Sequence, residues 1–588
     1  MPRLLPAILL TGLFAPFVMA RSSAPEDRSW VARSNAYTQQ LIDVSNRHSP
    51  ENASAEGLAA YDTKISVLTQ ADQDEERAET EVVLKRLKAS LSTEKDPRVL
   101  QDIHILISDT DRSFRRQDYE RAHKVPFLNA PELVFSGLQG LLDDQTAPDR
   151  RRAAVVRLNK YAGIDAGSKP LTDLARTFVL ARMDHPGVSF PSRLRMETEL
   201  ARNGNYIDGI ADLFRKYKLT GWEPAYDRLK TELASYDAWQ RASVLPRART
   251  DFRLAPADYA LSLEGYGVDL PPEKLAAQAH ASFLAIQAEM APLATAIARQ
   301  HGFAATDYRS VLAELKRQQI TGDAILPLYE NRLHQIEGLI TAHQIVTLPS
   351  RPAIIRLATA AETAQVPAPH MQPPPFLHNT GQRGVFILPL NLPAGDGAKA
   401  KVFDDFTYDA VAWTLTAHEA RPGHELQFDS MVEQGVSLAR ALYAFNSTNA
   451  EGWGLYSEYL IKPYMPADGQ LASLDLRLLR AARAFLDPEL QAGKITPEAA
   501  KQILMQDVVL SDAFATSEVE RYTIKSPGQA NSYFYGYNRL LDLRRETEGA
   551  LGSKFNALRF HDFILAQGLL PPDLMRKAVL DEFVPSQH

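Results

Sequence analysis

One short stretch, residues 414–428 (TLTAHEARPGHELQF), constrains this chain more than any other, because two His-Glu pairs flank a Pro-Gly step in it. Apolar residues recur at helical spacing through residues 406–415 and predict a helix that leads into His418. Helical zinc sites usually carry two histidines four residues apart, which places both on one helix face. Here the second histidine, His424, comes six residues after the first, and on an unbroken helix it would lie about 240° away.

The Pro-Gly step between the two histidines can change that angle. Pro422 removes one backbone N–H and pushes back on the preceding turn, and Gly423 can adopt backbone conformations that are closed to other residues. Two extra residues can therefore loop out of the helix and return His424 to the face of His418. The alternative is a helix that ends at Arg421, with His424 capping that end or exposed, and the spacing alone does not separate the two.

Two imidazoles and one carboxylate can bind a zinc ion and leave a fourth position open for water. We therefore predict that His418 and His424 bind Zn²⁺ together with Glu451, which follows in NAEGWGLYSEYL. Glu419 is the predicted general base, because a carboxylate beside the metal can take the proton of the attacking water. Glu458 lies seven residues after Glu451 on nearly the same helix face, and it is either an alternative ligand or a group that orients a ligating histidine.

These motifs also carry a resemblance to a known family. HEARPGHELQ together with AEGWGLYSEYL resembles the bacterial family designated domain of unknown function 885, whose pattern is close to HEAxPGHxxQ followed by EGWxLYxE. The resemblance extends over roughly residues 32–582 and includes SPGQANSYFYGYNRLLDLRRET, which is similar to a Tyr- and Arg-bearing segment of the family. It implies a metallopeptidase of the glutamate-zincin type. Many members have His where this chain has Glu425, which favours His424 as the second ligand here.

The resemblance also implies an architecture and a substrate class. It implies a mainly α fold of helical zincin-like metallopeptidase architecture, with a small β-sheet beside the active-site cleft and short peptides as substrates. The sequence GVFILPLNLP, at the end of a Pro-rich stretch, reads as a strand of that sheet. We predict that residues 384–388, with Gly384 and Phe386, form an edge strand that binds an extended peptide backbone. A plain structural hairpin is the alternative.

The segment that begins at residue 526 supplies further candidates. If it is helical, Tyr533 and Tyr537 share one face, and either hydroxyl can donate a hydrogen bond to the oxyanion of a tetrahedral intermediate. Arg544 lies seven residues beyond Tyr537 on the same face. Its guanidinium group can bind the terminal carboxylate of a peptide in a bidentate ion pair. It can equally pair with its neighbours Asp542 or Glu546 on a solvated helix.

The N-terminal residues 1–20 have the pattern of a secretory signal, with Arg3 before an apolar run and Ala20 at its end. The chain contains no cysteine, so this segment is not a lipoprotein signal, and an exported protein of this kind depends on its core rather than on disulfides. The formal net charge of −7 and the lack of a basic block argue against nucleic-acid binding. No other long apolar run follows, which predicts no membrane span after signal cleavage and a periplasmic or secreted protein.

These observations lead to one domain plan and one function. Residues 1–20 are the predicted signal peptide, residues 21–245 an N-terminal helical region that flanks the cleft, and residues 246–588 a helical catalytic region with the metal site. The predicted function is that of an exported zinc-dependent peptidase, which hydrolyses short peptides with metal-activated water. A catalytically inactive peptide-binding protein on the same fold is the alternative, and hydrolysis of a non-peptide amide is a third option. The oligomeric state stays open.

Overall fold

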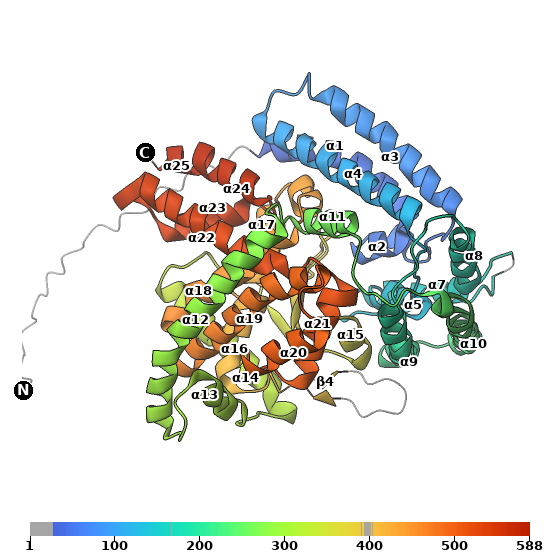
Figure 1. Cartoon of the computed structure of the whole chain (residues 1–588). Coiled ribbons are helices and arrows are strands. Elements are labelled where there is room, and N and C mark those ends of the chain that lie inside the picture. Colours follow the sequence, from blue (N-terminus) through green and yellow to red (C-terminus); the bar gives the residue numbers. More distant parts are fainter. Residues whose placement is uncertain (1–27, 166, 390, 393–400, 403, 588) are drawn as a thin grey trace, which may run out of the picture.

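In a computed structural model of the chain, the structure describes residues 28–165, 167–389, 391–392, 401–402 and 404–587. The predicted signal segment, residues 1–20, lies outside these described residues. Helices dominate the described part (Figure 1). Its largest sheet has three short strands. The predicted mainly α fold class is thereby confirmed.

The N-terminal part of the chain forms two groups of helices at one end of the molecule (Figure 1). The first group holds α1 (Ser29–His48), α3 (Gln70–Ser90) and α4 (Pro97–His123), with the short α2 (Pro50–Ala55) beside them. The second group holds α5 (Ala130–Gln139), α6 (Pro148–Arg151), α7 (Ala153–Tyr161), α8 (Leu171–Met183), α9 (Arg193–Lys216) and α10 (Glu223–Trp239). The predicted boundary at residue 245 falls in a pair of turns, η2 (Gln240–Val244) and η3 (Leu245–Arg247), and stays a prediction.

The rest of the chain forms a larger helical body around α19 (Ala467–Gln491), which is buried along almost its whole length. α19 packs against α12 (Pro272–His301), α16 (Asp409–Leu415) and α22 (Asn531–Leu551). The remaining helices of this body are α11 (Pro256–Tyr266), α13 (Tyr308–Lys316), α14 (Ile325–Ala342), α15 (Ala360–Gln365), α17 (His424–Gln434), α18 (Ser447–Ile461), α20 (Pro497–Gln506), α21 (Asp512–Glu520), α23 (Ala557–Ala566), α24 (Pro572–Ala578) and α25 (Val584–Ser586). Its π-helical turns are η5 (Thr416–Ala420), η6 (Ala439–Tyr443), η8 (Arg521–Lys525) and η10 (Val579–Phe583).

Local sequence explains where several helices begin. Ser192 caps α9 by accepting the backbone N–H of the third helical residue. α4 begins with Pro97 directly after the capping Asp96, and proline suits the first helical position because the N–H it lacks has no partner there. Thr359 and Glu362 form a reciprocal capping box at the start of α15.

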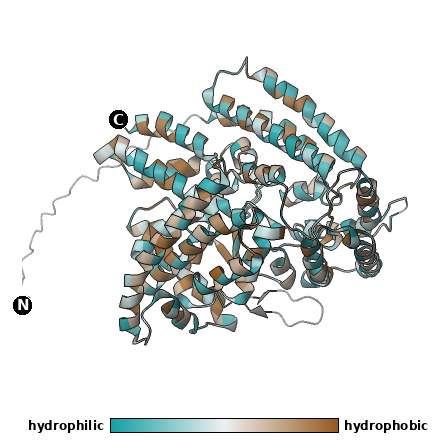
Figure 2. Ribbon diagram, in the orientation of Figure 1, coloured by the Kyte–Doolittle hydropathy of each residue, from teal (hydrophilic) through white to brown (hydrophobic). Residues whose placement is uncertain are grey.

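Among the described helices, α12 alone is long and apolar enough to cross a membrane by length and composition. A core helix of a folded domain passes the same test. One face of α12, which includes Phe283, Met290 and Ala294, is buried in the main hydrophobic core and lies along α19. Leu284 on another face is 67% exposed. Figure 2 shows hydrophobic and hydrophilic residues mixed along the helices of this body, as expected for helices with one buried face.

α18 and α22 cross at a pair of glycines. A Cβ built on Gly536 would lie 2.0 Å from the carbonyl oxygen of Thr448, and one built on Gly452 would lie 2.6 Å from the carbonyl carbon of Gly536. Non-bonded atoms do not approach one another this closely, so only glycine allows the two backbones to cross at this distance. The crossing matters for the site described below because α18 carries Glu451 and α22 carries Tyr533.

Gly536→Ala is expected to destabilise the protein by about 1–3 kcal/mol or more, because the new methyl group must push α18 and α22 apart. Gly549→Ala is the matched control, since Gly549 lies on the same helix and a Cβ there meets no atom within 4 Å. The control is expected to stabilise the protein by about 0.5–1 kcal/mol, because alanine is the better helix former. Urea unfolding followed by circular dichroism measures both, and equal effects would contradict the close crossing.

The structure contains the predicted small sheet, but its strand order corrects the prediction. β1 (Ile354–Leu357), β2 (His370–Gln372) and β3 (Val385–Leu388) form one sheet in the order β1-β3-β2, with β3 parallel to β1 and antiparallel to β2. β3 is therefore the central strand, and both of its edges are already paired. The prediction that residues 384–388 form an edge strand for substrate is wrong for this reason. A separate pair is formed by β4 (Asn391–Leu392) and β5 (Lys401–Val402).

The two residues predicted to bind a substrate backbone have structural contacts instead. Phe386 is fully buried, and its ring meets that of Tyr329 edge to face at 5.6 Å. Gly384 donates its backbone N–H to Oδ1 of Asp429 at 3.0 Å. A Cβ on Gly384 would lie 3.0 Å from Cγ of Glu425. Gly384, directly before β3, therefore joins this segment to α17 through Asp429. The alternative of a plain structural hairpin agrees with these contacts and with the antiparallel pairing of β2 and β3.

Candidate metal centre

His418 and His424 lie on either side of a break between two helices. α16 continues into the π-helical turn η5, which carries His418. The helix then stops, the peptide bond between Arg421 and Pro422 is cis, and α17 begins at His424. The predicted loop-out of two residues is thus replaced by a break between two helices. His424 is the first residue of the second helix, and it is buried rather than exposed.

Gly423 makes this break possible. A Cβ on Gly423 would lie 1.8 Å from the carbonyl oxygen of His418 and 2.5 Å from that of Ala417, so any other residue would collide with the preceding turn. Trp453 of α18 holds the same segment, because its indole N–H donates to the carbonyl oxygen of Pro422 at 2.9 Å. The break therefore folds the chain back over His418, and α18 keeps it there.

Three of the predicted residues converge at this point. The rings of His418 and His424 lie 4.7 Å apart at an angle of 84°. Glu451 on α18 places its Oε2 3.5 Å from Nε2 of His418 and 3.3 Å from Nε2 of His424. The three candidate ligand atoms all lie within 4.8 Å of one another. The structure therefore brings together the residues that the sequence pattern selected as metal ligands.

This arrangement fits a four-coordinate zinc ion. Ligand atoms about 2.0–2.1 Å from a tetrahedral zinc ion lie about 3.3 Å from one another, which matches the two separations of 3.5 and 3.3 Å. Oε2 of Glu451 is buried and makes no hydrogen bond to another described residue. Gly454 leaves room for this geometry, since a Cβ there would lie 2.5 Å from the ring of His418. Burial opposes the charged form of Glu451, but the two imidazoles outweigh it and hold the pKa of Glu451 well below its usual range.

Glu458, two turns beyond Glu451 on α18, orients the ring of His418. Its Oε1 lies 2.8 Å from Nδ1 of His418, and its Oε2 accepts the hydroxyl of Thr414 at 2.6 Å. Arg480 adds an ion pair at 3.3 Å. A proton held on Nδ1 leaves the lone pair of Nε2 free, which is the tautomer that binds a metal. Glu458 therefore contacts Nδ1 of His418 rather than Nε2, and it is not among the candidate ligand atoms.

The carboxylates around His418 favour positive charge at this point. Burial lowers the pKa of His418, but the neighbouring carboxylates of Glu451 and Glu458 outweigh burial and raise it to about 9. Burial also raises the pKa of Glu458, but Arg480 and His418 outweigh it, so that this pKa lies below its usual range. A divalent cation can satisfy the same carboxylates in place of a proton.

Glu419, the predicted general base, lies near Nε2 of His418, which is the candidate ligand atom of that histidine. Its Oε1 is 4.0 Å from Nε2 of His418, and its side chain is 9% exposed. A carboxylate at this distance from a ligand atom can accept a proton from a water molecule at the open coordination position. The site therefore contains both a possible ligand set and a base next to it.

Tyr533 of α22 lies against the centre. Its ring is 6.4 Å from the ring of His418 and nearly parallel to it, at 15°. Its hydroxyl accepts a hydrogen bond from Nη1 of Arg521 at 3.1 Å. Burial raises the pKa of Tyr533, and the negative charge of Glu451 raises it further. The tyrosine therefore keeps its proton and can donate it in a hydrogen bond.

Tyr537, one turn further along α22, faces another part of the interior. It lines a small cavity with Arg477 and Tyr459, and its ring lies 6.4 Å from that of Tyr459. Burial raises the pKa of Tyr537 to about 12. Glu458 also lines this cavity and stands between it and His418. Of the two predicted tyrosines, the geometry favours Tyr533 as the one that faces the candidate ligands.

Arg483, Glu518 and Arg521 form a charged cluster behind the ring of Tyr533, and the sequence did not predict it. Arg483 places its guanidinium 4.4 Å from the centre of the Tyr533 ring and binds Glu518 through Nε and Nη2, at 2.7 and 2.8 Å. Arg521 lies 3.8 Å from the same carboxylate. Two guanidinium groups thus share one buried carboxylate, which leaves positive charge beside the tyrosine. The three residues come from α19, α21 and η8, and no local motif links them.

Arg544, predicted to bind a terminal carboxylate, is held by other partners. Its Nε binds Glu548 at 2.7 Å, and its Nη1 donates to the hydroxyl of Tyr456 at 2.9 Å. It lies eleven positions after Tyr533, which corresponds to about 16 Å along α22. The structure therefore does not bring Arg544 to the centre. A structural ion pair was the stated alternative, although the partner is Glu548 rather than the acidic neighbours named for it.

Glu425, the residue after the candidate ligand His424, is part of the structural support. It is fully buried, and its carboxylate accepts hydrogen bonds from Nε and Nη2 of Arg421 at 2.7 and 3.1 Å. Burial raises the pKa of Glu425 to about 7, against the opposing effect of Arg421. Glu425 is not among the clustered ligand atoms, whereas His424 is.

Comparison with known proteins identifies the relatives of this chain. The family described as "Bacterial protein of unknown function (DUF885)" matches residues 50–579. The chain belongs to this family. The resemblance carried by its motifs is thereby confirmed, and no curated protein matches the chain significantly.

Two solved structures share the fold of this DUF885 protein. A candidate lipoprotein from Colwellia psychrerythraea aligns with a TM-score of 0.76 at 18% identity, over 95% of this chain and 100% of that one. A candidate lipoprotein of unknown function from Shewanella oneidensis aligns with a TM-score of 0.68 at 19% identity, over 94% of this chain and 100% of that one. At this identity the likeness shows the fold alone.

Proposed function

We propose that this DUF885 protein is an exported zinc-dependent peptidase that hydrolyses short peptides. One observation carries the proposal: Oε2 of Glu451 lies 3.5 and 3.3 Å from the Nε2 atoms of His418 and His424, with Oε1 of Glu419 4.0 Å from the same atom of His418. Two imidazoles and a carboxylate that leave one position open are a donor set of catalytic rather than structural zinc. The neighbouring carboxylate supplies the base that such a site needs.

The residues of the site have distinct roles in the proposed reaction. His418, His424 and Glu451 would hold the ion, which when bound would supply Lewis acidity towards water and a carbonyl oxygen. Glu419 takes the proton of the attacking water and then hands it to the leaving amine. Glu458 keeps a proton on Nδ1 of His418, so that Nε2 stays free for the ion.

Tyr533 donates its hydroxyl proton in a hydrogen bond to the oxyanion of the tetrahedral intermediate. Arg521 donates to the same hydroxyl and thereby orients and polarises it. Arg483 lies over the ring. The positive charge that the two arginines leave beside Tyr533 favours negative charge on the reacting oxygen.

Tyr533→Phe is expected to lower kcat about 100-fold, because one donor to the oxyanion is lost while the ring and its packing remain. Tyr537→Phe is the matched control on the same helix, and its kcat is expected to stay close to that of the parent. Steady-state hydrolysis of a short fluorogenic peptide measures both. A larger loss for Tyr537→Phe than for Tyr533→Phe would reverse the assignment.

The proposed activity is tested on the purified full chain. Metal analysis by inductively coupled plasma mass spectrometry is expected to find about one zinc ion per chain, and a digest of mixed short peptides is expected to yield cleavage products. A chelator should abolish cleavage, and added zinc should restore it. Retention of peptides without cleavage by the zinc-loaded protein would instead support the alternative of a peptide-binding protein.

Export is the remaining part of the proposal. It is supported by the signal pattern of residues 1–20. The two solved relatives are described as candidate lipoproteins, which is a class of envelope proteins. The given sequence contains no cysteine, and the proposed location is the periplasm or the exterior of the cell.

A further inference from the structure

A cavity of about 910 Å³ lies between the N-terminal helices and the larger helical body. Its lining comes from the C-terminal end of α4, from the start of α9, from the segment that leads into α11, and from η8 with the residues that follow it. None of its lining residues belongs to the candidate metal centre. A cavity of this size can hold a small organic ligand or a few residues of a peptide.

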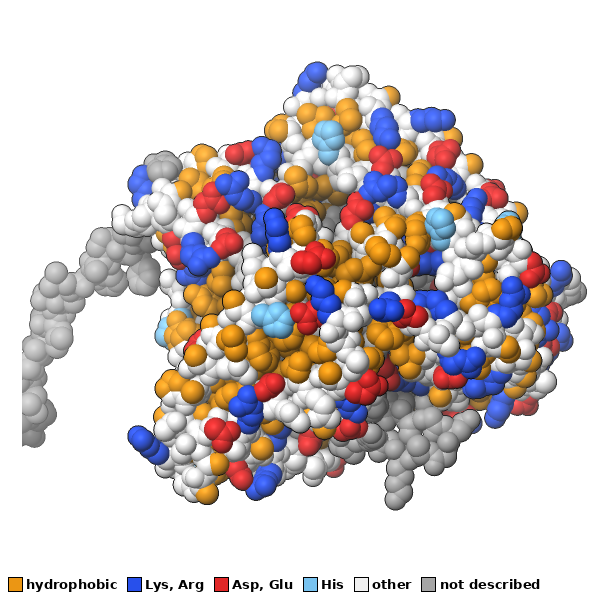
Figure 3. Space-filling view, in the orientation of Figure 1, with side chains coloured by type: hydrophobic (Ala, Val, Ile, Leu, Met, Phe, Trp, Pro, Cys, Tyr) orange, Lys and Arg blue, Asp and Glu red, His pale blue; other side chains and the backbone are white. Residues whose placement is uncertain are grey.

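The cavity is cationic, although the chain has a formal net charge of −7. Eight Lys and Arg line it, against four Asp and Glu. On the face of the molecule in Figure 3, acidic and basic side chains are instead interspersed. The lining cations are Arg116, Arg121, Lys124, Arg182, Arg195, Arg249, Arg253 and Lys525.

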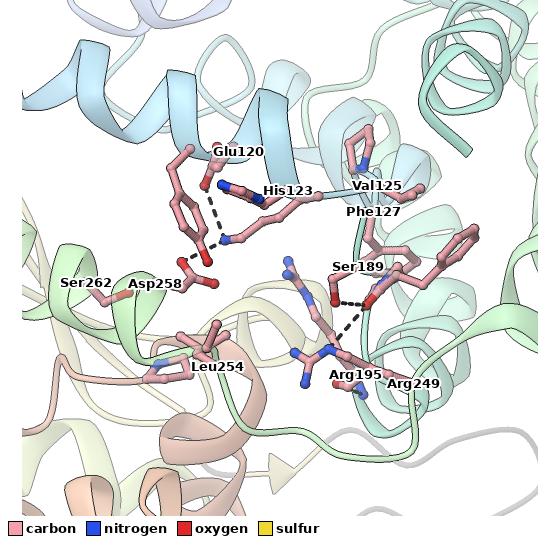
Figure 4. Close-up of a pocket in the computed structure, with 18 of the residues that line it drawn as sticks. Glu120, His123, Val125, Phe127, Ser189, Arg195, Arg249, Leu254, Asp258 and Ser262 are labelled. Atoms are coloured by element: carbon pink, nitrogen blue, oxygen red, sulfur yellow. Dashed lines mark hydrogen bonds and ion pairs between the residues drawn. The ribbon is translucent and has the colours of Figure 1, made fainter. Parts of the chain in front are cut away.

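Arg195 and Arg249 form a part of the cavity lining in which positive charge is not paired with any carboxylate that the structure describes. Arg195 packs over the ring of Phe127 at 5.5 Å and makes no ion pair with a carboxylate of the described residues. Arg249 donates to three backbone carbonyls and to no carboxylate within the described part of the chain. Figure 4 shows the two side chains next to one another, on the side of the cavity opposite Asp258. Burial lowers the pKa of Arg249, as expected for a charge with incomplete compensation.

Lys525 also lines the cavity, but its ammonium group is held by residues outside the lining. Its Nζ donates to the backbone carbonyls of Ala364 and Gln365 at 3.3 and 3.2 Å, and burial lowers its pKa. Lys525 ends η8, the turn that begins with Arg521. This short turn therefore connects the lining of the cavity with Arg521, which donates a hydrogen bond to the hydroxyl of Tyr533.

We propose that this cavity binds an organic ligand that carries carboxylate or phosphate groups. The guanidinium group of Arg195 offers paired N–H donors that match either kind of oxyanion. Arg249, whose Nε and Nη1 already donate to backbone carbonyls, can add a donor through Nη2. A concave surface with surplus positive charge also raises the local concentration of anions. Aromatic residues give the cavity apolar surface for an organic ligand rather than a bare ion, and these are Tyr119, Phe127, Phe178, Phe190, Phe252 and Tyr266.

Isothermal titration calorimetry of the full chain tests this proposal with three probes. The probes are Ac-Glu-Glu-Glu-Glu-NH2, inorganic phosphate and the neutral Ac-Gln-Gln-Gln-Gln-NH2. The chain carries Glu419→Gln, so that no peptide is cut and the result does not depend on the proposed peptidase activity. Saturable binding of the acidic peptide, of phosphate or of both is expected, with weaker binding at higher salt. Binding of the peptide alone identifies a carboxylate ligand, and binding of phosphate alone identifies a phosphate ligand.

A matched pair of variants locates the binding. Arg195→Ser is expected to weaken binding about tenfold or more, because a charge-assisted hydrogen-bonding group is lost from the wall. Arg193→Ser is the control, since Arg193 lies on the same helix, is 43% exposed beside Glu197 and does not line the cavity. No saturable binding of either anionic probe, equal binding of the neutral peptide, or unchanged affinity in Arg195→Ser would each overturn the proposal.

Discussion

Glu451→Gln is expected to leave the purified protein without bound zinc and without peptidase activity. The substitution keeps the shape of the side chain but removes the negative charge that lies 3.5 and 3.3 Å from the two imidazole nitrogens. Two neutral imidazoles alone lack the third protein ligand of a catalytic zinc site. Zinc per chain after dialysis, measured by inductively coupled plasma mass spectrometry, and peptide hydrolysis by the same sample give the result.

Glu458→Gln is the matched comparison on the same helix. Glu458 meets His418 through Nδ1 and not through the atom that faces Glu451. Its replacement is therefore expected to weaken zinc affinity by about 10–100-fold without abolishing binding. Full zinc content in Glu451→Gln would contradict the assigned ligand set. Complete loss in both variants would mean that Glu458 is itself needed as a ligand.

Glu419→Gln is expected to lower kcat by about 10²–10⁴-fold while the zinc content stays unchanged. An amide cannot accept the proton of the attacking water, and none of the three candidate ligand atoms is altered. Glu498→Gln is the control, because Glu498 is exposed in the first turn of α20, and both its kcat and its zinc content are expected to match the parent. Steady-state kinetics and metal analysis on the same preparations measure the two quantities.

The same variant separates hydrolysis from binding. A peptide-binding protein has no turnover to lose, so both the parent and Glu419→Gln would retain peptides without cleaving them. A hydrolase loses turnover in this variant and keeps its affinity for peptides. An unchanged kcat in Glu419→Gln would show that another group acts as the base.

The candidate ligands could be selected from the sequence because few residue types can bind zinc and because the family motif contains them. The spacing of six residues between His418 and His424 did not by itself predict that they meet, but the structure brings them together with Glu451. The backbone conformation between His418 and His424 was harder to predict from the sequence. It depends on the close approach of Gly423 to the preceding turn and on the hydrogen bond from Trp453, which comes from a helix later in the chain.

The errors in the sequence-based predictions come from contacts between distant segments. Residues 384–388 have the pattern of a strand, but their place in the sheet is decided by β1 and β2, which flank them on both sides. Arg544 shares a helix face with Tyr533, yet Tyr456 of α18 and Glu548 bind it instead. Arg521 was missed because it comes from a turn before α22, and only the folded chain places it on the hydroxyl of Tyr533.

Diffraction at the zinc absorption edge, on crystals of the protein as purified, tests the central claim most directly. The account predicts one strong anomalous peak about 2.0–2.1 Å from Nε2 of His418, Nε2 of His424 and Oε2 of Glu451. No peak at this position, even after crystals are soaked in zinc, would contradict the account. A peak held by other residues would contradict it equally.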